Sequence, residues 1–82
     1  MKAIKVEWCE NWIRSRFTKH LAFPGGGIEV GCFWAMAEES GLWLRGTFGS
    51  AMSIALEKLT NVETIHNNEG QFLYNVFRLK EQ

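Results

Sequence analysis

Two cysteines and two histidines, Cys9, His20, Cys32 and His66, are the residues best suited to metal binding or nucleophilic chemistry. A zinc site needs three or four such ligands brought together. The spacings here, 11, 12 and 34 residues, match no compact zinc module. A catalytic thiol would need a neighbouring base, and Cys32 stands in an apolar stretch, as a core thiol does. We therefore expect structural thiols and surface histidines, with no catalytic residue, no metal and no cofactor.

A short basic stretch points to a different chemistry. Arg14 and Arg16 fall on one face if this stretch is a strand, with Trp12 beside them and Lys19 close behind. Single-stranded nucleic acid is bound by such a combination, with phosphate on arginine and a base on the aromatic ring. Two arginines are few for this purpose, and a solvated strand face explains them equally well. The alternative prediction for the function is accordingly a small nucleic-acid-binding module that uses this basic segment.

The aromatic content favours a protein partner. Four Trp and six Phe in 82 residues are more large rings than a small core can hide. If residues 28–36 form a strand, Phe33 lies on the face opposite the apolar one. There it is either covered or stands exposed with one or more of Trp8, Trp12 and Trp43. Aromatic side chains and arginine are enriched at protein–protein contacts. The sequence therefore predicts a non-enzymatic interaction or accessory domain that binds a protein partner or a second copy of itself.

Charge and hydropathy limit the remaining function classes. The nine basic and nine acidic residues cancel, so net charge gives no argument for nucleic acid or an anionic membrane. The charge is uneven, since residues 1–23 hold five basic and two acidic side chains. The start of the chain lacks the apolar run of a signal peptide, and no stretch approaches a membrane span. We expect a cytoplasmic protein with reduced thiols and infer no small-molecule ligand.

The first half of the chain is ambiguous between strand and helix. Alternating apolar residues predict strands over residues 3–8 and 12–18, although helical spacing also fits the second segment. Residues 28–37 alternate in the same way and predict a hairpin with residues 42–45, with its turn at residues 38–41. Segment 28–40 could instead be a helix ending at a Gly41 cap. The run of one proline and three glycines at residues 24–27 predicts a loop.

The second half carries clearer signals. Ser50 is a suitable N-cap for a helix whose stripe comprises Met52, Ala55, Leu56 and Leu59. Residues 62–66 and 71–80 predict a hairpin around a turn at residues 67–70. The expected fold is one small α+β domain over residues 1–82. It has a mostly antiparallel sheet of about five to six strands, with one helix on one face, in the order β-β-β-β-α-β-β.

Overall fold

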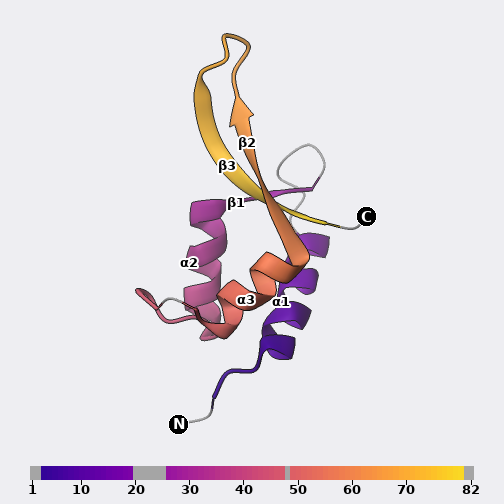
Figure 1. Ribbon diagram of the computed structural model, residues 1–82, viewed down its shortest axis with the longest axis vertical. Coiled ribbons are helices and arrows are strands. Elements are labelled where there is room, and N and C mark those ends of the chain that lie inside the picture. The colour runs from indigo at the N-terminus through magenta and orange to yellow at the C-terminus, as the bar shows by residue number, and fades with distance from the viewer. Residues whose placement is uncertain (1–2, 20–25, 48, 81–82) are drawn as a thin grey trace.

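The computed structural model describes residues 3–19, 26–47 and 49–80, and for residues 18 and 19 it describes the backbone only. The described elements follow the order α1 (Val6–Lys19), β1 (Ile28–Glu29), α2 (Val30–Ser40), α3 (Ala51–Leu59), β2 (Thr60–His66) and β3 (Phe72–Leu79). The helices gather at one end, and the hairpin of β2 and β3 extends along the 49 Å long axis of the molecule (Figure 1).

The prediction of five to six strands and one helix is wrong. The described residues form three helices and one three-stranded antiparallel sheet, in the strand order β1-β3-β2. α1 takes the place of the predicted strands over residues 3–8 and 12–18 from Val6 onward, and residues 3–5 and 42–45 form no strand. Residues 28–37 contribute only two residues to the sheet before α2 begins. The helical alternatives for residues 12–18 and 28–40 fit the structure.

α1 is a helix because its buried side chains repeat every four residues. Cys9, Ile13 and Phe17 are all buried and face the rest of the molecule. Glu10 lies one turn before Arg14 and forms an ion pair with it at 3.8 Å, which adds modest local support. Helical packing of this stripe against α3 outweighs the strand preference of the aromatic and β-branched residues.

α2 is defined by a cap at each end. The Glu29 carboxylate accepts hydrogen bonds from the backbone N–H groups of Gly31 and Cys32, at 2.9 and 3.0 Å. At the other end Gly41 adopts the left-handed conformation with φ of 81° and donates its N–H to the Glu38 carbonyl. Because both of its ends are capped, this segment forms a helix in spite of its strand-like alternation of apolar residues. The helix buries Phe33.

The helix and the hairpin predicted for the second half are confirmed, but Leu59, expected in the buried stripe, is only partly buried. Ser50 caps α3, since its hydroxyl accepts a hydrogen bond from the N–H of Ser53. Met52, Ala55 and Leu56 are buried. β2 and β3 pair as an antiparallel hairpin, with a register irregularity between Ile65 and His66. The predicted loop at residues 24–27 lies outside the described residues, except for Gly26 and Gly27.

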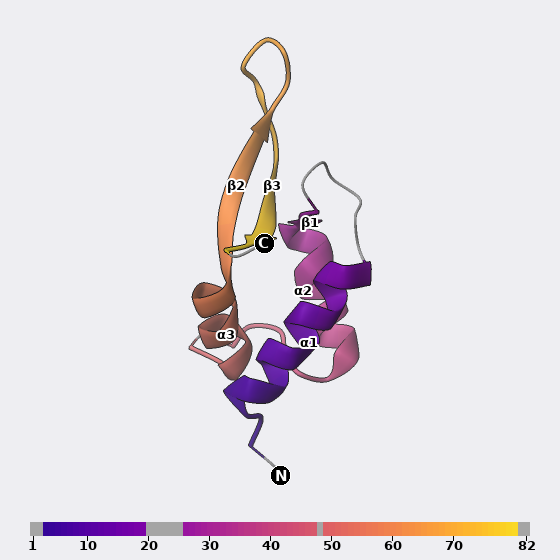
Figure 2. The same cartoon turned by 90° about the vertical axis from the view of Figure 1, so that its right-hand side faces the viewer.

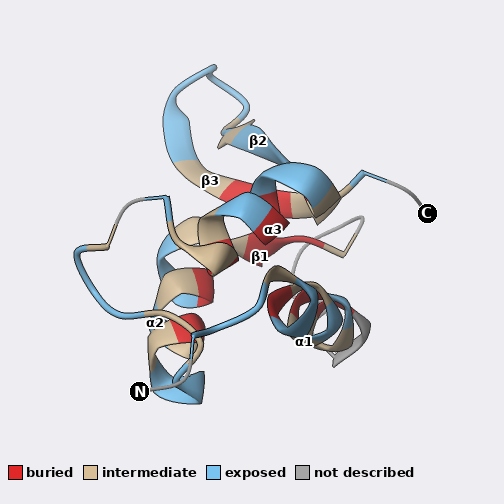
Figure 3. Cartoon of the chain, turned by 60° about the horizontal axis from the view of Figure 1, so that its bottom comes forward, coloured by how far each residue is buried: buried red, intermediate tan, exposed pale blue. Residues whose placement is uncertain are grey.

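The core lies where the three helices meet the root of the hairpin. Figure 3 shows the buried segments of the helices and strands facing one another at this junction. The Phe33 ring, fully buried, contacts the rings of Trp12, Trp34 and Phe77 edge-on, with centroids 5.2 to 5.5 Å apart. Such edge-to-face contacts favour one packing arrangement. Phe33 therefore joins α1, α2 and β3 in a single core.

Candidate functional site

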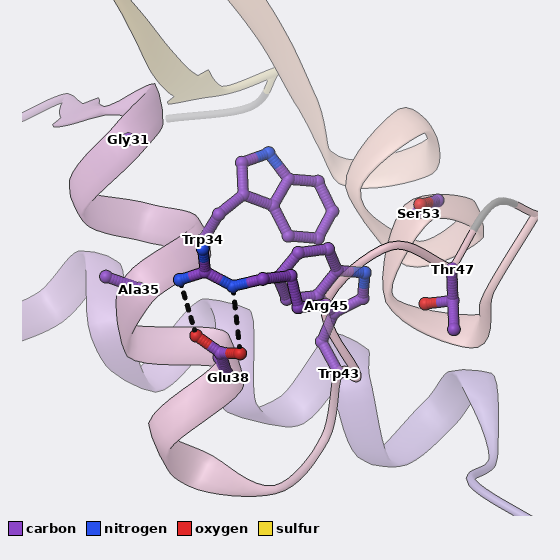
Figure 4. Close-up of a pocket in the computed structure, with 8 residues that line it drawn as sticks. All are labelled: Gly31, Trp34, Ala35, Glu38, Trp43, Arg45, Thr47 and Ser53. Carbon is purple, nitrogen blue, oxygen red and sulfur yellow. Dashed lines mark hydrogen bonds and ion pairs between the residues drawn. The ribbon is translucent and has the colours of Figure 1, made fainter.

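A groove opens beside this core, between α2, the loop of residues 41–47 and α3. Its first part has a volume of about 510 Å³. Figure 4 shows Trp34 and Glu38 reaching it from α2, Trp43 and Arg45 from the loop, and Ser53 from α3. The helices hold the outer walls in place, while the capped end of α2 at Gly41 turns the chain back and brings the loop residues alongside the helix.

Two tryptophans form the apolar wall of this groove. The rings of Trp34 and Trp43 lie 4.6 Å apart, tilted by 48°. Both are only partly buried and pack against the core. The indole Nε1 of Trp43 is buried and has no hydrogen-bond partner among the residues that the structure describes.

An ion pair closes the end of the groove. Arg45 donates from Nε to one Glu38 carboxylate oxygen at 3.2 Å and from its terminal nitrogen to the other at 3.1 Å. These hydrogen bonds hold the pKa of Glu38 below its ordinary value. The Arg45 side chain is 80% exposed, so the pair adds little to stability. The exposed side chain can be approached by a bound group from solvent.

A second hollow of about 440 Å³ extends the groove toward the root of the hairpin. The two hollows share Trp34 and Ser53 as lining residues, and together they are here called the aromatic groove. The second hollow is lined by apolar, polar and charged residues, and its two charged residues, Glu57 and Lys80, carry opposite signs. Its other lining residues are Leu56, Glu57, Thr60, Asn61, Val62, Phe77 and Lys80.

The basic segment has a different geometry from the one predicted. Arg14 and Arg16 are two positions apart on a helix, so they point to different sides and do not share a face. Arg14 is exposed and pairs with Glu10, whereas the Arg16 guanidinium lies 5.8 Å from the Trp12 ring centre. Lys19 ends α1, and its side chain lies outside the described part of the chain.

The aromatic residues predicted for a binding surface are divided by the structure. Phe33 is 0% exposed, so the expectation that it stands on an open face is wrong. Trp12 is partly buried against it, on the side of α1. Trp43 lines the aromatic groove. The sequence reasoning missed Trp34, Glu38 and Arg45, although positions 34 and 38 share one face of a helix whenever residues 28–40 are read as helical.

The cysteines show no sign of activation. Cys9 is buried, and burial raises the pKa of its thiol. Cys32 is exposed, so its expected place in the core is wrong. The hydrogen bond from its thiol to Glu29 raises the Cys32 pKa, which disfavours the reactive thiolate form. Within residues 3–19, 26–47 and 49–80, no three metal-binding side chains are grouped together.

Membrane insertion through a helix has no candidate in the described residues, because none of their helices is both long and apolar enough to cross a bilayer. Comparison of the chain with models of protein families, with curated proteins and with solved structures finds no match. The functional reading of the aromatic groove therefore rests on its own geometry and chemistry.

Proposed function

We propose that this chain is a non-enzymatic protein-interaction domain, and that the aromatic groove receives a segment of its partner. The carrying observation is the Trp34–Trp43 wall, which leaves two large rings partly exposed in a concave surface. Aromatic pockets of this kind accept apolar anchor residues, which supply most of the binding energy at protein interfaces. Two free cysteines agree with a cytoplasmic location.

The polar ends of the groove define the kind of segment that fits. Arg45 lines the first hollow, where it is paired with Glu38, and Lys80 lines the second, so each hollow carries one basic side chain. An extended segment with one apolar side chain on the tryptophans and an acidic group near Arg45 would match both features. Such recognition combines an apolar anchor with a charged rim.

Selection of peptides from a displayed random library on the intact protein tests this proposal. Ala35 is exposed and lines the groove, so Ala35→Gln narrows the groove without disturbing the core. Glu39→Gln is the matched control, an exposed α2 position that does not line the aromatic groove. We expect enriched peptides with a shared apolar anchor, whose affinity falls about tenfold or more in Ala35→Gln and stays unchanged in the control. Enriched peptides that bind both variants equally, or no enrichment at all, would contradict the proposal.

A second candidate, nucleic-acid binding, is favoured by the connectivity. Helix-turn-helix domains with a β-hairpin wing share this order of helices and strands, and helix-turn-helix proteins place the second helix of the pair in the major groove. By that analogy of fold alone, α3 would face nucleic acid. Its outward residues Ile54, Glu57 and Lys58 offer one positive charge, and Lys58 pairs with Glu10 at 3.2 Å. This charge is low for phosphate contacts.

Titration of the protein into labelled duplex and single-stranded oligonucleotides separates the two candidates. Binding that weakens steeply as salt rises would favour nucleic acid. The structure leads us to expect no such binding, because the positive charges around α3 and the hairpin are matched by Glu57, Glu63 and Glu69. The Lys58→Ala variant would lower the salt dependence only if α3 contacts phosphate.

A further inference from the structure

The hairpin of β2 and β3 projects beyond the helices, with its turn far from the core (Figures 1 and 2). Large apolar side chains stand open along it, with Val62 59%, Phe72 55% and Leu73 49% exposed. β1 pairs only with Phe77 and Val76 at the root, so the described outer half consists of two strands. A two-stranded hairpin is marginally stable in water, and a third strand is normally needed.

β2 offers an edge at which a further strand can pair. It is the outermost strand of the sheet order β1-β3-β2. Edge strands are commonly protected by lysine, proline or inward charges, but β2 contains neither lysine nor proline. Its one carboxylate, on Glu63, is bound by Arg78 of the neighbouring strand. Within the described residues, the edge of β2 therefore lacks the usual protection against strand pairing.

The phase of the hairpin ladder identifies the free backbone groups. The N–H of Lys80 donates to the carbonyl of Leu59 at 2.9 Å. Along an antiparallel ladder, hydrogen-bonded residue pairs alternate with non-hydrogen-bonded pairs. Because Leu59 and Lys80 form a hydrogen-bonded pair, Thr60–Leu79 is a non-hydrogen-bonded pair and Asn61–Arg78 is a hydrogen-bonded pair. Continuing the alternation, Val62 and Thr64 direct their N–H and C=O groups away from β3, toward the open edge.

We propose that β2 pairs, antiparallel and about a two-fold axis, with β2 of a second copy of this chain. In such a pairing, either Val62 or Thr64 lies opposite the same residue of the second copy. Either register lets the outward N–H and C=O groups of the two copies form hydrogen bonds, and in neither do the two Glu63 side chains lie opposite each other. The resulting sheet has four strands across the two hairpins, which removes both open β2 edges. The net charge of the chain is zero, so no net-charge repulsion opposes the pairing of two copies.

Analytical ultracentrifugation over a wide range of protein concentrations tests the pairing with two variants at one position. Thr64→Pro removes the outward N–H, whereas Thr64→Val keeps it. Both variants lose the hydroxyl hydrogen bond to the Asn75 side chain. A comparison of the two therefore reports the effect of the backbone N–H at position 64. We expect the wild type and Thr64→Val to dimerise alike, and Thr64→Pro to associate about thirtyfold more weakly, since the symmetric pair loses two hydrogen bonds.

Amide hydrogen exchange in the wild type decides the case if Thr64→Pro fails to fold. The amides of Glu63 and Ile65 should be protected at every concentration, because they point to β3. Those of Val62 and Thr64 should gain protection only as concentration rises. A wild type that stays monomeric throughout, or a dimer in which the Val62 and Thr64 amides remain unprotected, would overturn the proposal. If the wild type stays monomeric, the partner of the β2 edge would be a strand of a different protein.

Discussion

The Glu29 carboxylate caps α2 through two backbone N–H groups, and these bonds hold its pKa below the ordinary value of 4.5. A carboxylate with a lowered folded pKa stabilises the fold above its unfolded pKa, and this contribution is lost as pH falls through the folded pKa. We expect Glu29→Ala to cost about 1 kcal/mol at neutral pH. The loss should shrink in acid. Urea unfolding at ~pH 7 and at ~pH 3 measures both effects, with Glu69→Gln in the exposed hairpin turn as the control. An equal loss at both pH values would mean that Glu29 acts without its charge.

Phe33 gives the second test at the scale of single residues. Because its ring is fully buried among three other aromatic rings, Phe33→Ala should lower the free energy of unfolding by about 3–5 kcal/mol. Phe72→Ala, at a half-exposed position, should change it by about 0.5 kcal/mol or less. Thermal unfolding of both variants at low protein concentration makes the comparison. Similar losses in the two variants would show that Phe33 is not the centre of the core.

Helix ends provide the clearest test at the scale of elements. A Cβ atom built on Gly41 would meet nothing within 4 Å, so any cost of adding one there arises from its φ of 81° alone. We expect Gly41→Ala to destabilise the fold by about 1 kcal/mol and Gly41→Asn by less, because asparagine tolerates the left-handed conformation. Denaturant midpoints of the two variants give the comparison. An alanine variant as stable as the wild type would contradict the cap.

The same caps explain which elements could be predicted from the sequence. Ser50 and the apolar stripe of α3 agree with each other, as do the turn residues and flanking strands of the last hairpin, so local signals there lead to the correct elements. In α1 and α2, large apolar residues occur on nearly every side, and both the two-residue and the four-residue periods fit. The choice depends on tertiary packing around Phe33 and on the Glu29 cap, and neither can be judged before the fold is known.

The candidate site was harder to predict than the fold, for a related reason. Trp43 was expected on a binding surface, and the structure places it in the aromatic groove. Its neighbours Trp34 and Glu38 share a face with each other only if α2 is a helix, and Arg45 reaches Glu38 only because Gly41 reverses the chain. When the secondary structure of residues 28–45 is predicted wrongly, the residues that line the groove are therefore predicted to lie apart.

At the scale of the whole molecule, the shared core predicts a single cooperative unfolding transition. The four tryptophans lie in α1, α2 and the loop before α3, whereas the one tyrosine, Tyr74, lies in the hairpin. Two spectroscopic probes therefore report on opposite ends of the long axis. Phe33 and Phe77 link these ends through rings 5.2 Å apart, so tryptophan fluorescence and the Tyr74 ring resonances should give the same denaturant midpoint.

Ile13→Ala tests this link from the far side of the core. Ile13 is fully buried in α1 and has no part in the hairpin, so its loss acts on Tyr74 only through the shared core. We expect a loss of about 2–5 kcal/mol that shifts both probes equally. Leu44→Ala, at a position 73% exposed, is the control and should shift neither. If the fluorescence midpoint falls while the Tyr74 midpoint stays, the hairpin is a separate unit held by its own contacts. In that case the packing of Phe33 on Phe77 does not couple the two ends.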